Sequence, residues 1–219
     1  MEFSTKNDIE GFVLAGGASS RMGLDKASVL LGGVALAERA VRTLLGVCER
    51  VYLVGGEARS DIAASIADMQ HPSAKGRRAA INGLYTALSC CKARFVAVLA
   101  CDMPFVTADL FAFMADEIGA QGRSGYDAVI PREADGRIQP LCAFYKKEPC
   151  LEKLRMMQTE RVPAIREFAA SLIVRYVEHR ELERFGDPAF LLSNVNTPAE
   201  LAAAEERLGL NSVAADGLP

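Results

Sequence analysis

Short apolar runs alternate along this chain with longer segments of helical periodicity. The clearest run is residues 95–100, Phe-Val-Ala-Val-Leu-Ala, which reads as a strand buried on both faces. The segment before it, residues 80–91, carries Ile81, Leu84 and Leu88 at helical spacing. This alternation is typical of folds in which crossover helices join parallel strands. We therefore expect an α/β fold, a three-layer sandwich with a mostly parallel, Rossmann-like central sheet.

The same patterns assign the other elements. Further strands are expected at residues 11–15, 51–54, 66–68, 126–131, 141–145 and 172–177. Further helices are expected at residues 36–47, 61–66, 148–158 and 163–170, and from residue 197 onward. At this last helix Thr197 can cap the N-terminus, Pro198 suits the first turn, and Glu200 completes a capping box.

Length and composition favour one globular domain over residues 9–210, with flexible termini at 1–8 and 211–219. The net charge of −3 is scattered, so no basic surface for nucleic acid is expected. An apolar signal core and a run long enough to span a membrane are both lacking, which favours a cytoplasmic protein without membrane contact. The six cysteines form no C-x-x-C pair and are expected as buried thiols, and both histidines are expected at the surface.

A glycine-containing loop, residues 14–26, follows the first strand and reads Leu-Ala-Gly-Gly-Ala-Ser-Ser-Arg-Met-Gly-Leu-Asp-Lys. Gly16 and Gly17 let backbone amides approach phosphate oxygens closely. Hydrogen-bond donors and cations for a triphosphate follow: Ser19, Ser20, Arg21 and Lys26. The loop has neither the Walker A pattern nor the G-x-G-x-x-G spacing. A Gly-Gly pair by itself fits a simple turn equally well, but the residues that follow favour triphosphate binding.

Asp102 lies directly after the buried strand 95–100 and shortly before Pro104. In open α/β sheets, ligands collect outside the carboxyl ends of the strands, so this carboxylate is expected to share a crevice with the glycine loop. Mg²⁺ needs few protein carboxylates when phosphate oxygens and water complete its coordination shell. Asp102 is therefore a candidate magnesium ligand, although an isolated Asp-x-Pro also fits a turn or a helix cap.

In combination these motifs resemble the molybdenum cofactor guanylyltransferase family, also called the molybdopterin-guanine dinucleotide biosynthesis protein A family, within the glycosyltransferase-A-like nucleotidyltransferases. The match runs in the family's order over about residues 10–208. It comprises the loop 14–26, Cys-Asp-Met-Pro at 101–104, Gln-Pro-Leu at 139–141 leading to Tyr145, and Asn-Val-Asn-Thr-Pro at 194–198. The fold implied is the nucleotide-diphospho-sugar transferase type. Gly17 favours the guanylyl branch over the cytidylyl branch, which usually reads Leu-Ala-Ala-Gly.

The resemblance also implies a role for each matched residue. The implied nucleotide site consists of Leu14, Ala15, Gly16, Gly17, Ser19, Arg21, Lys26, Asp68 and Asp102. Leu14, Ala15 and Gly16 would contact guanine and ribose through backbone groups. Arg21 and Lys26 would bind the phosphates, Asp102 would hold Mg²⁺, and these three form the implied catalytic set. Asp68 would accept hydrogen bonds from guanine or a ribose hydroxyl. Asn194 and Asn196 would lie on the acceptor side, near the pterin phosphate.

Two places depart from the family pattern. Val54 stands where the family usually carries an asparagine after its second strand. Residues 79–83 read Ala-Ala-Ile-Asn-Gly instead of Gly-Pro-Leu-Ala-Gly and keep only the last glycine. Both places surround the nucleotide in the family, so guanine against cytosine selectivity depends on them.

The implied reaction joins GMP from GTP to the terminal phosphate of molybdopterin and releases pyrophosphate. Within the same chemistry, the alternatives are a cytidylyltransferase for the same cofactor and a sugar-phosphate or phospholactate nucleotidyltransferase. An alternative of another class is a non-catalytic GTP-binding module that hands over the cofactor. The family context implies a molybdenum-insertion protein and apo-molybdoenzymes as partners.

Overall fold

The computed structural model describes residues 8–15, 26–55, 61–69, 80–120, 125–157 and 164–209. The strands of the main sheet are β1 (Ile9–Leu14), β4 (Arg50–Val54), β5 (Ala64–Ile66), β6 (Phe95–Ala100), β7 (Ala128–Pro131), β8 (Cys142–Lys146) and β9 (Val174–Val177). A separate hairpin consists of β2 (Leu30–Leu31) and β3 (Val34–Ala35).

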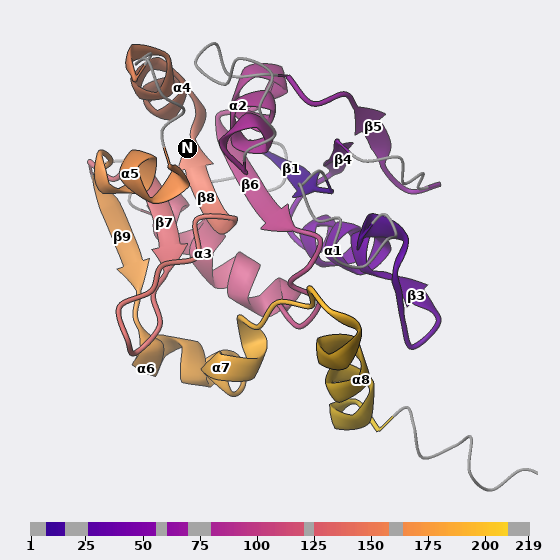
Figure 1. Cartoon of the computed structure of the whole chain (residues 1–219). Helices are drawn as coiled ribbons and strands as arrows, with labels where there is room; N and C mark the ends of the chain where they lie inside the picture. Colours follow the sequence, from indigo (N-terminus) through magenta and orange to yellow (C-terminus); the bar gives the residue numbers. More distant parts are fainter. Residues whose placement is uncertain are drawn as a thin grey trace, which may run out of the picture.

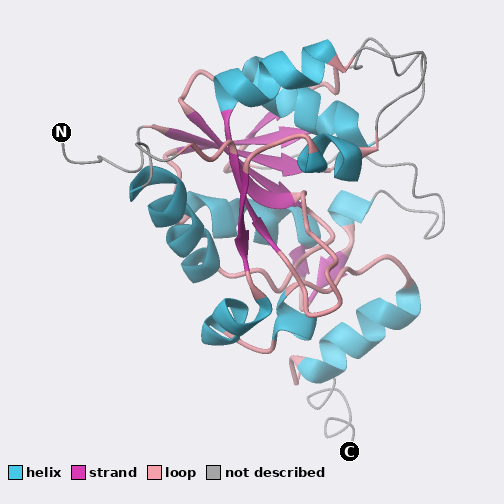
Figure 2. Cartoon of the chain, turned by 90° about the vertical axis from the view of Figure 1, so that its left-hand side faces the viewer, coloured by secondary structure: helices cyan, strands magenta, loops and turns pink. Residues whose placement is uncertain are grey.

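Helices cover both faces of the sheet, and further helices lie beyond the carboxyl ends of its strands (Figures 1 and 2). The helices are α1 (Leu36–Leu45), α2 (Ala80–Cys90), α3 (Ala108–Ala120), α4 (Lys147–Met156), α5 (Ile165–Ala170), α6 (His179–Leu182), α7 (Pro188–Leu191) and α8 (Pro198–Arg207). Two short 3₁₀ helices are η2 (Lys26–Ser28) and η4 (Glu183–Phe185). The three-layer α/β sandwich expected from the sequence is confirmed.

The order of strands in the main sheet is β5-β4-β1-β6-β8-β7-β9. β1 pairs in parallel with β4 and β6, and β4 pairs in parallel with β5. β8 is antiparallel to both of its neighbours, whereas β7 and β9 are parallel to each other. All strands except β8 therefore run in the same direction, so the sheet is mostly parallel. Their carboxyl ends form one edge, and in Figure 1 the arrowheads of β6, β7 and β9 point toward α7 and α8.

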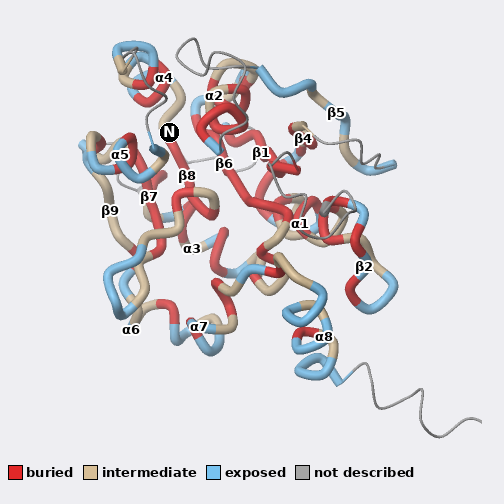
Figure 3. The backbone as a smooth tube through the Cα atoms, viewed as in Figure 1, coloured by how far each residue is buried: buried red, intermediate tan, exposed pale blue. Residues whose placement is uncertain are grey.

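Side chains of the central strands alternate between the two faces of the sheet, as the strand period of two requires. On β6, Phe95, Ala97 and Leu99 pack in a cluster with residues of α1 and α3. Val96 and Val98 pack in a second cluster with residues of α2, α4 and α5. Because both faces are covered, these strands are buried along their whole length, which explains the unbroken apolar runs (Figure 3).

Gly11 allows α1 to pack closely against β1. A Cβ atom at this position would lie 3.0 Å from Val51 Cγ2, 3.2 Å from Cys48 Sγ and 3.2 Å from Leu44 Cβ. These distances are shorter than ordinary van der Waals contacts between carbon atoms. A glycine is therefore needed where β1, β4 and α1 meet.

Several sequence-based assignments were wrong or missing. The helix expected at 61–66 is not formed, because Ala64–Ile66 is the edge strand β5, which also begins two residues before the strand expected at 66–68. A three-residue edge strand carries too few buried side chains to show a period. The helix Ala108–Ala120 was not expected from the sequence, although Thr107 caps it through a 3.3 Å hydrogen bond from the Leu110 amide to its Oγ1.

Other expectations concern the whole chain. Residues 1–7 and 210–219 lie outside the described residues, so the flexible termini and the single domain over 9–210 stay predictions. All six cysteines are free thiols; five of them are buried, as expected, and Cys90 is partly exposed. Within the described ranges, no helix combines the length and apolar character of a membrane span. His179 is 38% exposed, and His71 falls outside the described ranges.

Candidate active site

The glycine loop begins between the carboxyl ends of β4 and β6. The Ala15 amide donates to the Val54 carbonyl at 2.9 Å, and the Cys101 amide donates to the Leu14 carbonyl at 3.1 Å. These bonds continue the parallel ladders of β1 beyond its last residue. Leu14 and Ala15 therefore lie beside the turn that carries Asp102, whereas the crevice that this turn is expected to share with the glycine loop stays a prediction.

The described part of the loop is its two ends. Gly16, Gly17, Ser19 and Arg21 lie outside the described residues, and of Lys26 only the backbone, which begins η2, is described. Downstream, Ala27 and Val29 are buried in two different core clusters. The Leu36 amide donates to the Val29 carbonyl at 2.9 Å. The described residues at both ends of the glycine-containing loop are thus attached to the core.

Asp102 lies on a tight turn directly after β6. The Met103 amide donates to the Ala100 carbonyl at 3.2 Å, which closes the turn, and the Met103 side chain is 2% exposed. Asp102 itself is partly exposed. The closed turn and the buried Met103 side chain therefore hold Asp102 directly after the end of β6.

The segment predicted to bind the acceptor contacts this turn directly. The Val195 amide donates to the Asp102 carbonyl at 2.8 Å, and the Val195 side chain is 1% exposed. On either side of this anchor, Asn194 is exposed and Asn196 is partly exposed. The structure therefore brings together Asp102 and the two asparagines, which are far apart in the sequence; their roles stay predictions.

A capping box fixes the other end of that segment. The Asn196 and Thr197 amides both donate to Glu200 Oε2, at 2.6 and 3.0 Å, and the Glu200 amide donates to Thr197 Oγ1 at 3.2 Å. These contacts satisfy free amides at the start of α8, as predicted from the sequence. Asn196 is therefore positioned by its backbone, and its side chain is not the helix cap.

Asp68 lies two residues beyond β5 and is exposed. The Met69 amide donates to Thr86 Oγ1 at 2.8 Å, the Thr86 hydroxyl donates to the Asn82 carbonyl at 2.9 Å, and Asp68 Oδ1 lies 3.4 Å from the same hydroxyl. Thr86 is fully buried in α2. No role was expected for Thr86 from the sequence; the available signal was the polar pair Asn82 and Thr86, four residues apart on a largely apolar helix.

At the two places that depart from the family pattern, the structure describes Val54 and residues 80–83. Val54 is fully buried and shares a core cluster with Leu14 and Ile81, so its side chain stabilises the sheet. A Cβ atom on Gly83 would lie 3.2 and 3.3 Å from the two δ-carbons of Leu14. The retained glycine therefore lets α2 pass close to the residue at which the nucleotide loop begins.

The carboxylate ligands among the described residues fit a Mg²⁺ ion whose coordination shell is completed by the substrate. No group of three or more His, Cys, Asp or Glu side chains suited to a metal occurs in the described part of the chain. Mg²⁺ is commonly bound through one or two carboxylates, with phosphate oxygens and water as the other ligands. The partly exposed carboxylate of Asp102 matches this type of site.

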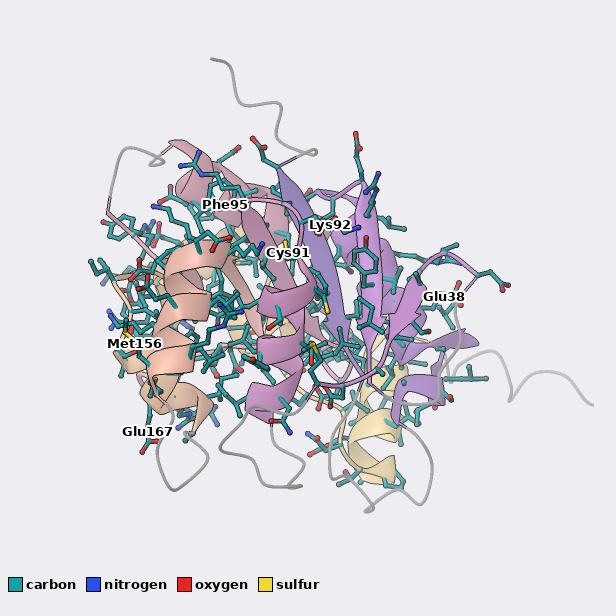
Figure 4. The ribbon with its side chains drawn as sticks, turned by 90° about the horizontal axis from the view of Figure 1, so that it is seen from above. Glu38, Cys91, Lys92, Phe95, Met156 and Glu167 are labelled. Atoms are coloured by element: carbon teal, nitrogen blue, oxygen red, sulfur yellow. The ribbon has the colours of Figure 1, made fainter. Side chains whose placement is uncertain are left out.

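A separate hollow of about 490 Å³ lies on α4, the helix labelled at Met156 in Figure 4. It is lined by Glu148, Leu151, Glu152, Arg155 and Met156. None of the residues predicted for the site contributes to this lining. The hollow therefore does not coincide with the site predicted at the carboxyl edge of the sheet.

A mostly parallel sheet with a glycine loop after its first strand and an aspartate after β6 defines a nucleotidyltransferase type of α/β enzyme. The chain belongs to the MobA-like NTP transferase domain family, whose model matches residues 11–178. The resemblance stated from the sequence motifs is thereby confirmed.

Relatives with similar sequences carry more specific names. The chain is 31% identical over 196 residues to a probable molybdenum cofactor guanylyltransferase of Pelotomaculum thermopropionicum, covering 89% of this chain and 90% of that one. It is 32% identical over 200 residues to a protein of the same name from Geobacillus sp., covering 89% and 96%. The crystal structure of molybdopterin-guanine dinucleotide biosynthesis protein A from Archaeoglobus fulgidus matches with a TM-score of 0.71 and 25% identity, covering 91% and 98%.

Proposed function

We propose that this protein transfers GMP from GTP to the terminal phosphate of molybdopterin, forming the guanine dinucleotide cofactor and pyrophosphate. The observation that carries the proposal is the hydrogen bond from the Val195 amide to the Asp102 carbonyl. It joins the strand end that would hold the nucleotide to the segment Asn194–Asn196, which would hold the acceptor. The names of the relatives support guanine as the base and molybdopterin as the acceptor.

In this reaction an oxygen of the molybdopterin phosphate attacks the α-phosphorus of GTP, and the bond from that phosphorus to the bridging oxygen of the β-phosphate breaks. The electron pair of the broken bond leaves with pyrophosphate. Backbone amides of Gly16 and Gly17 are proposed to approach the phosphates, and backbone groups of Leu14, Ala15 and Gly16 to contact guanine and ribose. Arg21 and Lys26 would offset the negative charge that grows on the leaving group. Bound at Asp102, Mg²⁺ would supply further charge neutralisation.

Asn194 and Asn196 are proposed to orient the acceptor. An asparagine amide donates hydrogen bonds to phosphate oxygens without adding a positive charge. The acceptor phosphate can then be held close while it keeps its nucleophilic electron density. The capping box that fixes the Asn196 backbone supports this role, because an acceptor must be held near the attack distance for efficient transfer.

Asp68 is proposed to contact the base or the ribose. It follows β5, and β4 separates that strand from β1, where the glycine loop begins. Two strand spacings amount to about 10 Å, which is comparable to the reach of a nucleoside from its α-phosphate. A carboxylate can accept hydrogen bonds from N1–H and N2–H of guanine, and cytosine offers no such pair of donors on one edge.

The substrate specificity is tested with the purified protein, Mg²⁺ and α-labelled GTP, CTP, ATP or UTP, each offered with molybdopterin and with sugar phosphates. We expect pyrophosphate release and labelled dinucleotide from GTP with molybdopterin. A preference for CTP would establish the cytidylyltransferase alternative, and turnover with a sugar phosphate would establish the second alternative. Binding of GTP without pyrophosphate release in the presence of acceptor would replace the enzyme proposal by the cofactor hand-over module.

The proposed reaction implies partner proteins and a location. A molybdenum-insertion protein would supply the acceptor, and apo-molybdoenzymes would receive the product. A cytoplasmic location is proposed because GTP is available there and because the six free thiols suit a reducing compartment. Co-purification of the tagged protein with a molybdoenzyme that lacks its cofactor would test the delivery step.

A further inference from the structure

An aromatic stack lies next to the contact between Asp102 and Val195. The rings of Phe105 and Phe190 have centroids 3.8 Å apart and an angle of 31° between their planes. Phe105 follows Asp102 on the turn after β6, whereas Phe190 belongs to α7 and precedes Asn194. The stack therefore joins the same two segments as the backbone hydrogen bond, at a second point.

The ring of Phe190 is held by an arginine as well. Arg207 in the last turn of α8 places its guanidinium carbon 4.2 Å from the Phe190 ring centroid. The same guanidinium forms an ion pair with Asp187 at 2.7 Å, and Asp187 caps α7 by accepting from the Ala189 amide at 3.1 Å. The two helices that flank the predicted acceptor segment are thus joined through Phe190.

A short, bonded stretch connects Phe190 to the acceptor segment. The Ser193 amide and the Ser193 hydroxyl both donate to the Phe190 carbonyl, at 3.0 and 2.8 Å. Asn194 follows directly, and Val195 is buried in a small cluster with Leu36 and Ala204, against which Phe105 also packs. Because these hydrogen bonds restrict the backbone between the two residues, a displacement of Phe190 would also displace Asn194.

We infer that Phe190 is a positioning residue that sets the distance and orientation of Asn194 and Asn196 relative to Asp102. The hydrogen bond from Val195 to Asp102 and the capping box at Thr197 hold the segment at its centre and on its C-terminal side. The contact of the Phe190 ring with the Phe105 ring holds its N-terminal side, because two large rings in contact allow few relative orientations. Phe190 itself need not touch either substrate.

The chain contains a matched aromatic cluster that lacks this connection. Phe113 on α3 and Phe185 in η4 have ring centroids 5.6 Å apart, and the guanidinium carbon of Arg184 lies 5.0 and 5.7 Å from them. Like Phe190, Phe185 is partly buried, and it precedes Phe190 by five residues. Its partner ring lies on a helix and not on the Asp102 turn, so it serves as the control.

The inference rests on the proposed function, and the test compares Phe190→Leu with Phe185→Leu in the full-length protein with GTP, molybdopterin and Mg²⁺. We expect Phe190→Leu to lower kcat/KM for molybdopterin about tenfold or more, because small displacements of positioning groups cost large factors in rate. The KM for GTP should change less than about twofold, since Phe190 is connected through Ser193 to the proposed acceptor segment Asn194–Asn196. Phe185→Leu should lower the melting temperature similarly and leave both kinetic constants near those of the wild type.

Two further variants separate positioning from stability. Phe190→Tyr keeps the ring and should restore most of the acceptor kcat/KM. Phe105→Leu combined with Phe190→Leu should cost little more than either change alone, because both remove the same stack. Equal kinetic effects of Phe190→Leu and Phe185→Leu, or equal effects on GTP and acceptor, would overturn the inference. A wild-type protein that releases no pyrophosphate would instead refute the proposed function.

Discussion

Replacing Thr86 by valine tests the connection between α2 and the segment that carries Asp68. Valine has nearly the shape of threonine, so the fully buried site stays filled while the hydroxyl is removed. The change removes the acceptor of the Met69 amide and the donor to the Asn82 carbonyl. It also removes the hydroxyl that lies 3.4 Å from Asp68 Oδ1, so it acts on the position of Asp68 without replacing that residue.

The magnitude follows from what happens to each group. An intramolecular hydrogen bond contributes about 1 kcal/mol net, so two lost bonds set an upper value of about 2 kcal/mol. Met69 is exposed, so its amide can bond to water, and the Asn82 carbonyl keeps its place in the helical hydrogen-bond ladder. We expect the free energy of unfolding to fall by about 1 kcal/mol.

The assay combines urea unfolding with steady-state kinetics, and Thr86→Ser is the matched control. Serine keeps the hydroxyl and loses a buried methyl group, which also costs about 1 kcal/mol. Thr86→Val should raise the KM for GTP about threefold to tenfold. A hydrogen bond from GTP to the Asp68 carboxylate would contribute about 1.5–3 kcal/mol, and a displaced Asp68 would lose part of this contribution. Thr86→Ser should leave the KM for GTP unchanged. Equal GTP constants in the two variants would refute the role assigned to Thr86.

Three further predictions concern packing, pH and thiol chemistry. Gly11→Ala should lower the free energy of unfolding by about 1–3 kcal/mol in urea titrations, because its Cβ would crowd β4 and α1. The hydrogen bond from Arg175 lowers the pKa of Glu181 below its ordinary 4.5, so this carboxylate stabilises the fold fully above pH 4.5 and less as the pH falls through the lowered pKa. The difference in unfolding free energy between wild type and Glu181→Gln should therefore shrink as the pH is lowered below 4.5. Burial raises the pKa of Cys91 to about 12, so a thiol reagent at neutral pH should modify the partly exposed Cys90 first, as peptide mapping would show.

Much of the fold could be predicted because buried parallel strands carry a strong local signal. The runs at β1 and β6 are apolar along their whole length since helices cover both faces of the sheet. The bounds of β5 were not predicted correctly, because this strand is three residues long, lies at an edge of the sheet and is mostly exposed. The direction of β8 is set by its antiparallel pairing with β6 and β7, which no local pattern reveals.

The candidate site divides in the same way. Asp102 and the Asn194–Asn196 segment could be named from motifs because each is a short stretch of chain. Thr86 and Phe190 were not named, since their importance depends on partners distant in the chain, Met69 in one case and Phe105 in the other. Contacts of this kind become visible only when the fold brings the segments together.

The central claim is most directly tested by pyrophosphate release from GTP and molybdopterin at increasing Mg²⁺, for the wild type and for Asp102→Asn. Asparagine keeps the backbone carbonyl that accepts from Val195, so the comparison isolates the carboxylate. We predict Mg²⁺-dependent release by the wild type and a rate at least about 100-fold lower for Asp102→Asn at saturating substrates. A variant that keeps a near-wild-type rate and the same Mg²⁺ dependence would contradict the account.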